Sequence, residues 1–187
     1  IDMSSLSAHK FYAPKGIGAI YIRDNLQIEP FMHGGKQENY KRAGTENVAS
    51  IVGLGRAIEI ANNNINEKNK KVSLLRNIFM RRVLNEIDDV KLNGHATNRL
   101  SGNVNLSFKH INGSKLAFIL GINGVAVSTG SACSCKSNKP SYVLTSIGLS
   151  PDDVKSSLRF TFGEENTEDD IDYVMKVLSL ALNELKN

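Results

Sequence analysis

The first residues suited to covalent chemistry stand near the start of the sequence, in the stretch Ser7-Ala8-His9-Lys10. A lysine amine that has lost its proton can form a Schiff base with an aldehyde cofactor such as pyridoxal phosphate. A hydroxyl and an imidazole beside the lysine are suitable hydrogen-bond donors to a phosphate group. Lys10 is therefore a candidate cofactor lysine, and an ordinary surface cation is the alternative reading.

The second place is the loop sequence STGSACSC, which holds the only two cysteines, Cys133 and Cys135. Small and polar neighbours leave a thiol accessible, and accessible thiols are the reactive kind. A disulfide between such close neighbours is strained. Two thiolates with four scattered histidines also make a poor closed metal site, so we expect no metal. Cys133 is a candidate nucleophile, with a small residue in a turn as the alternative.

A third candidate is Arg159, in the stretch SSLRFTFG. Here Leu158 and Phe160 alternate with Arg159 and Thr161, which is typical of a strand with one apolar face. A guanidinium on the other face can bind a carboxylate through two parallel hydrogen bonds, and it keeps its charge. The alternative is an exposed arginine at a strand edge.

The composition is ordinary for a soluble protein with an apolar core: 41% of the 187 residues are hydrophobic, 22% are charged, and the net charge is +4. The basic residues are scattered without interleaved aromatic residues, so we expect no nucleic-acid partner. Apolar runs such as IVGLG are far shorter than the roughly 20 residues that a bilayer requires. With no signal-peptide pattern and no stapling disulfide, we expect a cytoplasmic protein without a membrane partner.

The first part of the chain is expected to contain a strand in GAIYIR (18–23), a long irregular loop (31–47) and then a helix. Apolar residues from Val48 onward recur at helical spacing. An asparagine-rich cluster at 62–66 weakens that pattern before it resumes at Val72, so we expect a soft domain boundary near 62–70.

The second part reads as a mixture of strands and helices. Strands are expected in VKLNG and GNVNLSFKH, a short helix in SKLAFILG, and a small-residue strand that leads into a Ser/Gly-rich loop within 124–140. The stretch 156–163 is a further strand. The sequence from Thr167 to Asp170 has the pattern of a capping box, which predicts the start of a C-terminal amphipathic helix.

Taken in order, these stretches resemble the cysteine desulfurases of the NifS-like type, within the class V aminotransferase group. The resemblance covers essentially the whole chain, and an ordered series of segments carries it. These segments are SAHKFYAPKGIGAIYIR, HGGKQENYKRAGTEN, STGSACSC, PSYVLTSIGLS and SSLRFTFGEENTEDDIDYVM.

The resemblance implies pyridoxal 5'-phosphate as cofactor and assigns it four residues. Lys10 would bond the cofactor and move the substrate α-proton, and Ser7 and His9 would contact the cofactor phosphate. Thr45, in RAGT, would reach the phosphate of the partner subunit's cofactor, which implies a homodimer.

The resemblance also assigns the residues that handle the substrate, L-cysteine. Arg159 would hold its α-carboxylate. Cys133 would attack its sulfur, leaving a persulfide on the enzyme and releasing alanine, and a sulfur-acceptor or Fe–S scaffold protein would receive the sulfur. Cys135 stands where the family more often has a small hydroxyl residue; a spare carrier, a resolving thiol and a tolerated substitution are the alternatives.

The implied fold class is α/β: residues 1–68 would end the large domain of a fold-type I pyridoxal-phosphate-dependent transferase, and residues 69–187 would form a small α+β C-terminal domain. The chain would then be about the second half of the enzyme, and we expect it to need the N-terminal half for stability and activity. Two rival functions stay open: a selenocysteine lyase or related lyase, and a non-catalytic sulfur-carrier half that docks on scaffold proteins.

Overall fold

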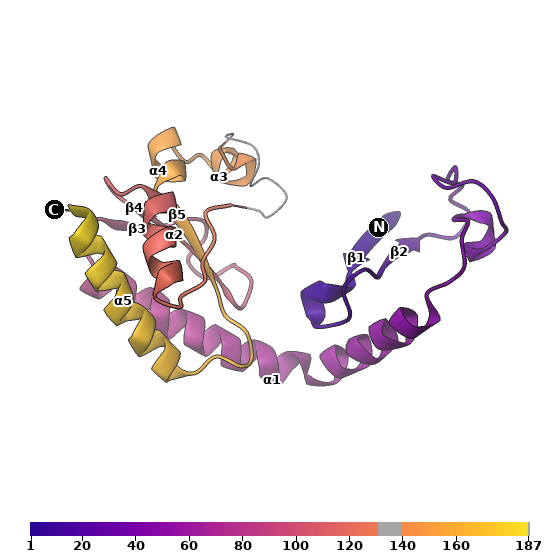
Figure 1. The fold of residues 1–187 in the computed structure, drawn as a ribbon, viewed down its shortest axis with the longest axis horizontal. Coiled ribbons are helices and arrows are strands. Elements are labelled where there is room, and N and C mark those ends of the chain that lie inside the picture. The colour runs from indigo at the N-terminus through magenta and orange to yellow at the C-terminus, as the bar shows by residue number, and fades with distance from the viewer. Residues whose placement is uncertain (131–139, 187) are drawn as a thin grey trace. The chain divides into compact units, whose positions relative to one another are not determined.

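The structure is a computed structural model that describes residues 1–130 and 140–186 (Figure 1). The chain divides into two compact units, Ile1–Ile65 and Asn66–Asn187. The long helix α1, Val48–Glu86, is continuous through the asparagine-rich cluster that was expected to weaken it. Asparagine costs a helix only a few tenths of a kcal/mol per residue relative to alanine, and no proline interrupts the run. The identity of the two units as family domains stays a prediction.

The first unit is built around a two-stranded antiparallel sheet. Strand β1, Met3–Ser7, pairs with β2, Gly18–Ile22, and the 3-10 helix η1, Ala8–Phe11, begins the connection between them. Its buried apolar core is small and consists of Ala8, Ala13 and Leu54. Residues 31–47 are irregular as expected, except for the short 3-10 helix η2, Glu38–Tyr40.

Much of the apolar surface of this first unit is exposed. Large side chains with more than half of their area exposed include Ile20, Tyr21, Phe31, Val48 and Val52.

The second unit contains a three-stranded antiparallel sheet in the order β3-β4-β5. The strands are β3, Val90–Leu92, β4, Asn103–Phe108, and β5, Ser157–Thr161. All three match strands expected from the sequence. Residues of β4 alternate along the strand, so that Val104, Leu106 and Phe108 are buried in the core while Asn103 and Asn105 lie on the opposite face.

Three helices supply the other side of this core: the second part of α1, α2 (Gly113–Ile122) and α5 (Glu168–Lys186). Figure 1 shows α2 and α5 beside the sheet. Phe79 of α1 is fully buried, and its ring centroid lies 4.9 Å from that of Phe160 and 5.4 Å from that of Phe162. The apolar stripes of these helices and the alternating strands together determine which sheet face remains polar.

Two short helices follow the undescribed residues 131–139: α3, Tyr142–Ser146, and α4, Pro151–Lys155. The prediction of a small-residue strand at the start of 124–140 is wrong for residues 124–130, which the structure describes. Only Ser128 pairs there, in a single bridge with Arg159. Gly124 has a φ of 76°, which a strand does not allow, and the Ser128 hydroxyl turns the chain by hydrogen bonding with Gly130. No helix in the described part of the chain combines the length and the apolar character that crossing a bilayer demands.

The expected capping box at the start of α5 is confirmed. The Thr167 backbone N–H donates to Asp170 Oδ2 at 2.9 Å, and the Asp170 backbone N–H donates to Thr167 Oγ1 at 3.4 Å. The Thr167 N–H, and secondly the Asn166 amide, lower the pKa of Asp170 below its ordinary value of 3.8. Because the folded-state pKa is lowered, the carboxylate stabilises the helix start above pH 3.8, and this contribution is lost as the pH falls through the folded-state pKa.

This capping box predicts a pH-dependent helix start. Asp170→Asn should reduce the hydrogen-exchange protection of the first-turn amides of α5 near neutral pH and remove most of its change with pH below 4. Asp169→Asn, which changes the same charge one residue away, is the matched control and should keep the wild-type pH profile. Identical profiles for both variants would show that Asp170 does not cap the helix.

Candidate functional site

The candidate cofactor residues of the first unit flank one buried alanine. Ala8 is fully buried; its N–H donates to the Ile17 carbonyl at 3.2 Å, and its carbonyl accepts from the Ala13 N–H at 3.2 Å. Ser7 ends β1, while His9 and Lys10 lie in η1, and all three of these side chains are exposed. The buried alanine thus anchors a short segment from which a hydroxyl, an imidazole and an amine project.

Helix α1 holds this segment from one side through a close contact at Gly53. A Cβ atom added to Gly53 would lie 2.8 Å from Cγ of Pro14, in the turn that follows η1. Leu54, the next residue of α1, is buried in the same small core as Ala8. The glycine is therefore required for the helix to approach the turn.

The donor set of this segment fits an aldehyde that carries a phosphate group. None of the Ser7, His9 and Lys10 side chains hydrogen-bonds to a residue within the described ranges, so their donors are available to a ligand. Thr45 is also exposed, in the loop before α1, and no hydrogen bond in the described chain joins it to this segment. An amine for covalent bonding and two donors for an oxyanion are what such a ligand requires.

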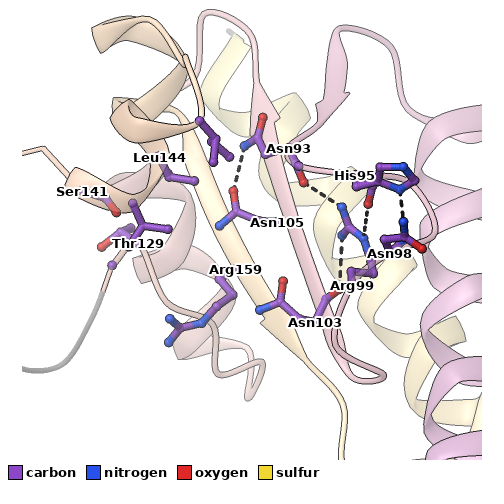
Figure 2. Close-up of a pocket in the computed structure, with 14 residues that line it drawn as sticks. Asn93, His95, Asn98, Arg99, Asn103, Asn105, Thr129, Ser141, Leu144 and Arg159 are labelled. Carbon is purple, nitrogen blue, oxygen red and sulfur yellow. Dashed lines mark hydrogen bonds between the residues drawn. The ribbon is translucent and has the colours of Figure 1, made fainter. Parts of the chain in front are cut away.

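The second unit contains a pocket of about 330 Å³ on the polar side of its sheet (Figure 2). Its walls come from the β3–β4 connection, from β4 and β5, and from α3. The lining residues are Asn93, Gly94, His95, Asn98, Arg99, Asn103, Asn105, Thr129, Gly130, Ser141, Val143, Leu144, Ile147 and Arg159. No aspartate or glutamate is among these described residues, whereas two arginines are, so the pocket suits an anion.

The two arginines have different tasks. Arg99 donates to the backbone carbonyls of His95 at 2.8 Å, Asn93 at 2.7 Å and Asn103 at 3.2 Å, so its guanidinium is used to hold the β3–β4 connection. Burial, and secondly the charge of Arg76, lower the pKa of Arg99, although a guanidinium remains charged in proteins. Its positive charge still contributes to the potential in the pocket.

Arg159 is half-buried on β5 and is one of the residues that line the pocket (Figure 2). Its backbone N–H donates to the Ser128 carbonyl at 2.7 Å, and its carbonyl accepts from the Ser128 N–H at 3.2 Å. Its guanidinium forms no hydrogen bond or ion pair within the described ranges. A fixed backbone with an uncommitted guanidinium is suited to binding a carboxylate.

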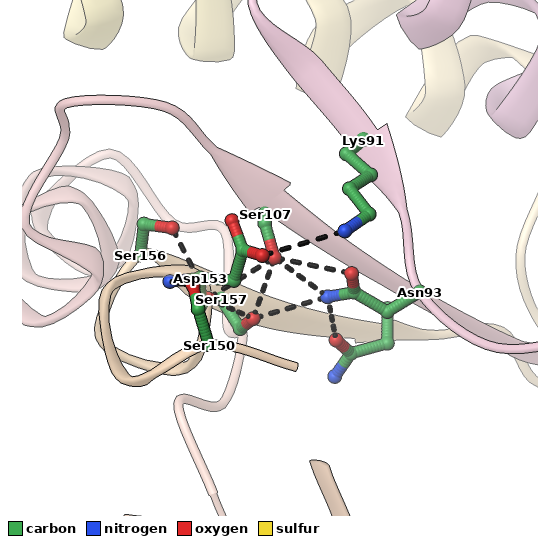
Figure 3. Close-up of polar contacts among 8 residues, drawn as sticks. Lys91, Asn93, Ser107, Ser150, Asp153, Ser156 and Ser157 are labelled. Carbon is green, nitrogen blue, oxygen red and sulfur yellow. Dashed lines mark hydrogen bonds and ion pairs between the residues drawn. The ribbon is translucent and has the colours of Figure 1, made fainter. Parts of the chain in front are cut away.

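A buried polar network lies next to this pocket (Figure 3). Asn93 is only 3% exposed, and its Nδ2 lies 2.7 Å from Asn105 Oδ1, 2.8 Å from Ser107 Oγ and 3.0 Å from Ser157 Oγ. Ser107 and Ser157 both donate to the backbone carbonyl of Asp153 in α4, at 3.0 Å and 2.6 Å. The network therefore joins β4, β5 and the residue that follows β3 to α4.

Sequence reasoning identified Arg159 but missed Asn93 and Asn105. Asn105 alternates with Val104 and Leu106, so its place on the polar face was available from the strand pattern. Asn93 gave no such signal. Cys133 and Cys135 lie outside the described residues.

Residues 1–174 match the family model described as aminotransferase class-V. The chain belongs to the class-V aminotransferase family. A family relative from Clostridium botulinum, named cysteine desulfurase IscS, is 52% identical over 180 residues, covering 95% of this chain and 45% of the relative. Another of the same name, from Dictyoglomus turgidum, is 47% identical over 186 residues, covering 100% and 47%.

Among solved structures, one described as a NifS-like protein matches this class-V chain with a TM-score of 0.88 and 34% identity. The match covers 99% of this chain and 47% of the NifS-like protein's chain. The resemblance to NifS-like proteins is therefore confirmed, and the chain spans about half the length of the curated relatives it matches.

The close approach at Gly53 predicts that α1 positions the Lys10 segment. Gly53→Ala should displace the turn at Pro14, because overpacking costs about 1–3 kcal/mol, and should lower the hydrogen-exchange protection of the Ala8 and Ala13 amides. Gly55→Ala is the matched control, because it gains the same helix propensity and a Cβ there meets no atom within 4 Å. Equal protection in the two variants would contradict the predicted role of this contact.

Proposed function

We propose that the chain is the C-terminal half of a pyridoxal-phosphate-dependent cysteine desulfurase, which converts L-cysteine to L-alanine and passes the sulfur to an acceptor protein. The observation that supports the proposal is the pocket that Arg159 lines: its described lining residues include no carboxylate, and the Arg159 guanidinium has no partner in the described part of the chain. The names of the two relatives, which are 47% and 52% identical over nearly the whole chain, support the same activity.

The proposed cofactor residues are those that flank Ala8. Lys10 would hold the cofactor through its aldehyde and would move the α-proton of the substrate, while Ser7 and His9 would donate to the cofactor phosphate. Thr45 donates to the phosphate of the cofactor in a second subunit, so the proposed enzyme is a homodimer. The bound cofactor supplies an electron sink that weakens the bonds around the substrate α-carbon.

Arg159 is proposed to bind the α-carboxylate of L-cysteine. Arg99 lines the same pocket, and its charge adds to the attraction although its guanidinium donates to backbone carbonyls. A substrate held at its carboxylate presents its remaining groups in a defined direction, which is the main contribution of a protein to this kind of chemistry.

The proposed sulfur transfer starts from the Cys133 thiolate, which attacks the sulfur of the bound L-cysteine. An S–S bond forms, the bond between sulfur and the substrate β-carbon breaks, and the β-carbon takes up a proton. The products are L-alanine and a persulfide on Cys133, with no external oxidant or reductant. An acceptor protein, such as an Fe–S scaffold or a tRNA-thiolation protein, then takes the sulfur by thiol exchange.

The exposed apolar surface of the first unit is proposed to be covered by the half of the enzyme that lies outside this chain. The curated relatives are about twice as long as the aligned region, and side chains such as Phe31, Val48 and Val52 are more than half exposed here. Because the proposed nucleophile must be a reduced thiol before each turnover, we propose a cytoplasmic location.

Removal of one thiol tests the proposed function in the complete protein. Cys133→Ala should lower sulfide release from L-cysteine in the presence of a thiol by at least about 100-fold, because the proposed nucleophile that attacks the substrate sulfur is removed. Cys135→Ala is the matched control and should keep most of the activity. Release of sulfide is followed by methylene-blue formation, and persulfide on Cys133 by mass spectrometry.

The rival functions give different outcomes in the same preparations. Unchanged sulfide release in Cys133→Ala would contradict the mechanism, and turnover of selenocysteine alone would indicate a selenocysteine lyase. A non-catalytic sulfur carrier would show neither a visible absorbance band from the cofactor nor cofactor trapped on Lys10 after borohydride reduction.

A further inference from the structure

We propose that Asn105 is a second substrate-binding residue, whose amide nitrogen donates to the same carboxylate as Arg159, and that Asn93 is the residue that orients it. This inference rests on the proposed function, because it names the substrate group that the Arg159 pocket recognises. The two side chains would together bind the α-carboxylate of an amino acid: the guanidinium through its fork and the amide through one further N–H.

The strand register brings the two residues side by side. Asn105 pairs with Arg159 between β4 and β5. The Arg159 backbone groups hydrogen-bond to Ser128, and the Asn105 carbonyl accepts from the Asn93 N–H at 2.9 Å. The backbone groups of Asn105 and Arg159 therefore do not hydrogen-bond to each other. This is a non-hydrogen-bonded antiparallel pair, whose side chains are the closer kind, with Cβ atoms about 4.5–5.5 Å apart on the same face.

The orientation of the Asn105 amide follows from the bond that it accepts. Asn93 Nδ2 donates to Asn105 Oδ1 at 2.7 Å, so the Asn105 oxygen faces Asn93 and its Nδ2 lies on the other side. Figure 2 shows the Asn105 nitrogen turned away from Asn93, in the pocket that Arg159 also lines. This Nδ2 has no hydrogen-bond acceptor in the part of the chain that the structure describes.

Asn93 is itself held by the buried network. One Nδ2 hydrogen goes to Asn105, and the other is shared between Ser107 Oγ at 2.8 Å and Ser157 Oγ at 3.0 Å. Asn93 Oδ1 lies 3.1 Å from Ser107 Oγ. Rotation of the Asn93 amide by 180° would place its oxygen against the Asn105 oxygen and would lose the donation to Asn105. This network therefore maintains one orientation of both amides. It leaves the Nδ2 of Asn105, with its two hydrogens, for a ligand.

The charges of the residues that line the pocket favour an anion as the acceptor for the Asn105 Nδ2. The described lining includes two guanidiniums and no carboxylate, and Arg99 already donates to three backbone carbonyls. Arg159 and Asn105 are therefore a matched pair of donors on neighbouring strands. A carboxylate has two oxygens with about four acceptor positions, which two such donors can share.

The test uses the complete holoenzyme and measures the dissociation constant of L-alanine by isothermal titration calorimetry. L-Alanine carries the carboxylate but no sulfur, so no turnover follows binding. Asn105→Ala should weaken binding by about 10-fold or more, because a hydrogen bond to a charged group is lost. Asn105→Asp should weaken it further, about 100-fold, because it keeps the acceptor for Asn93 but replaces the donor with a negative charge beside Arg159.

Two controls separate this role from a structural one. Asn85→Asp makes the same charge change on an exposed part of α1 and should leave the dissociation constant within about twofold of the wild-type value. Ethylamine, which lacks the carboxylate, should bind equally well to the wild type and to both Asn105 variants. An unchanged L-alanine affinity in Asn105→Asp would overturn the proposal.

The orienting role of Asn93 is tested by a double-mutant cycle on the same measurement. Asn93→Ala should weaken L-alanine binding when Asn105 is present and have little further effect in the Asn105→Ala background. Equal effects in both backgrounds would show that Asn93 acts on the fold and not through Asn105.

Failure of the inference is distinguishable from failure of the proposed function. Sulfide release from L-cysteine together with an L-alanine affinity that ignores Asn105 would overturn the inference and keep the function. Absence of sulfide release, with L-alanine affinity still dependent on Asn105 and Arg159, would overturn the function and keep the carboxylate site.

Discussion

The polar side of the second unit depends on one buried carboxamide. Asn93 is almost fully buried, and leaving its amide unsatisfied there would cost about 1–3 kcal/mol. Its bonds to Asn105, Ser107 and Ser157 satisfy it only if β3, β4 and β5 keep their observed register. A slip of one residue in β4 would also turn Val104, Leu106 and Phe108 out of the core, so polar and apolar constraints require the same arrangement.

In this arrangement one face of the sheet packs in the core and the other lines the pocket. The apolar face packs on the helices, with Phe79 and Phe160 in contact, and supplies stability. The polar face carries Arg159 and Asn105, whose donors have no acceptor among the described residues. Arg99 donates to backbone carbonyls and contributes its charge to the pocket. The first unit follows a similar logic on a smaller scale, because buried Ala8 anchors the exposed Lys10 segment. The proposed enzyme would use the first unit for its cofactor and the second for its substrate.

Much of this could be predicted from local sequence patterns, and the failures have physical causes. Alternation predicted β4 and β5 and the outward-facing Arg159, and the Thr167–Asp170 pattern predicted the cap of α5, because both depend on neighbours in sequence. The Asn cluster at 62–66 did not interrupt α1, since propensity is a weak term. Asn93 was missed because its partners lie 12, 14 and 64 residues away. The roles of Lys10, Thr45 and Cys133 stay predictions.

The central claim is that the Arg159 pocket is the carboxylate-binding part of a desulfurase active site. A crystal structure of the complete Cys133→Ala protein with pyridoxal phosphate and bound L-cysteine tests it most directly. The account predicts a substrate carboxylate oxygen about 2.7–3.2 Å from a guanidinium nitrogen of Arg159. A carboxylate bound by other residues, with the Arg159 guanidinium turned to solvent, would contradict the account.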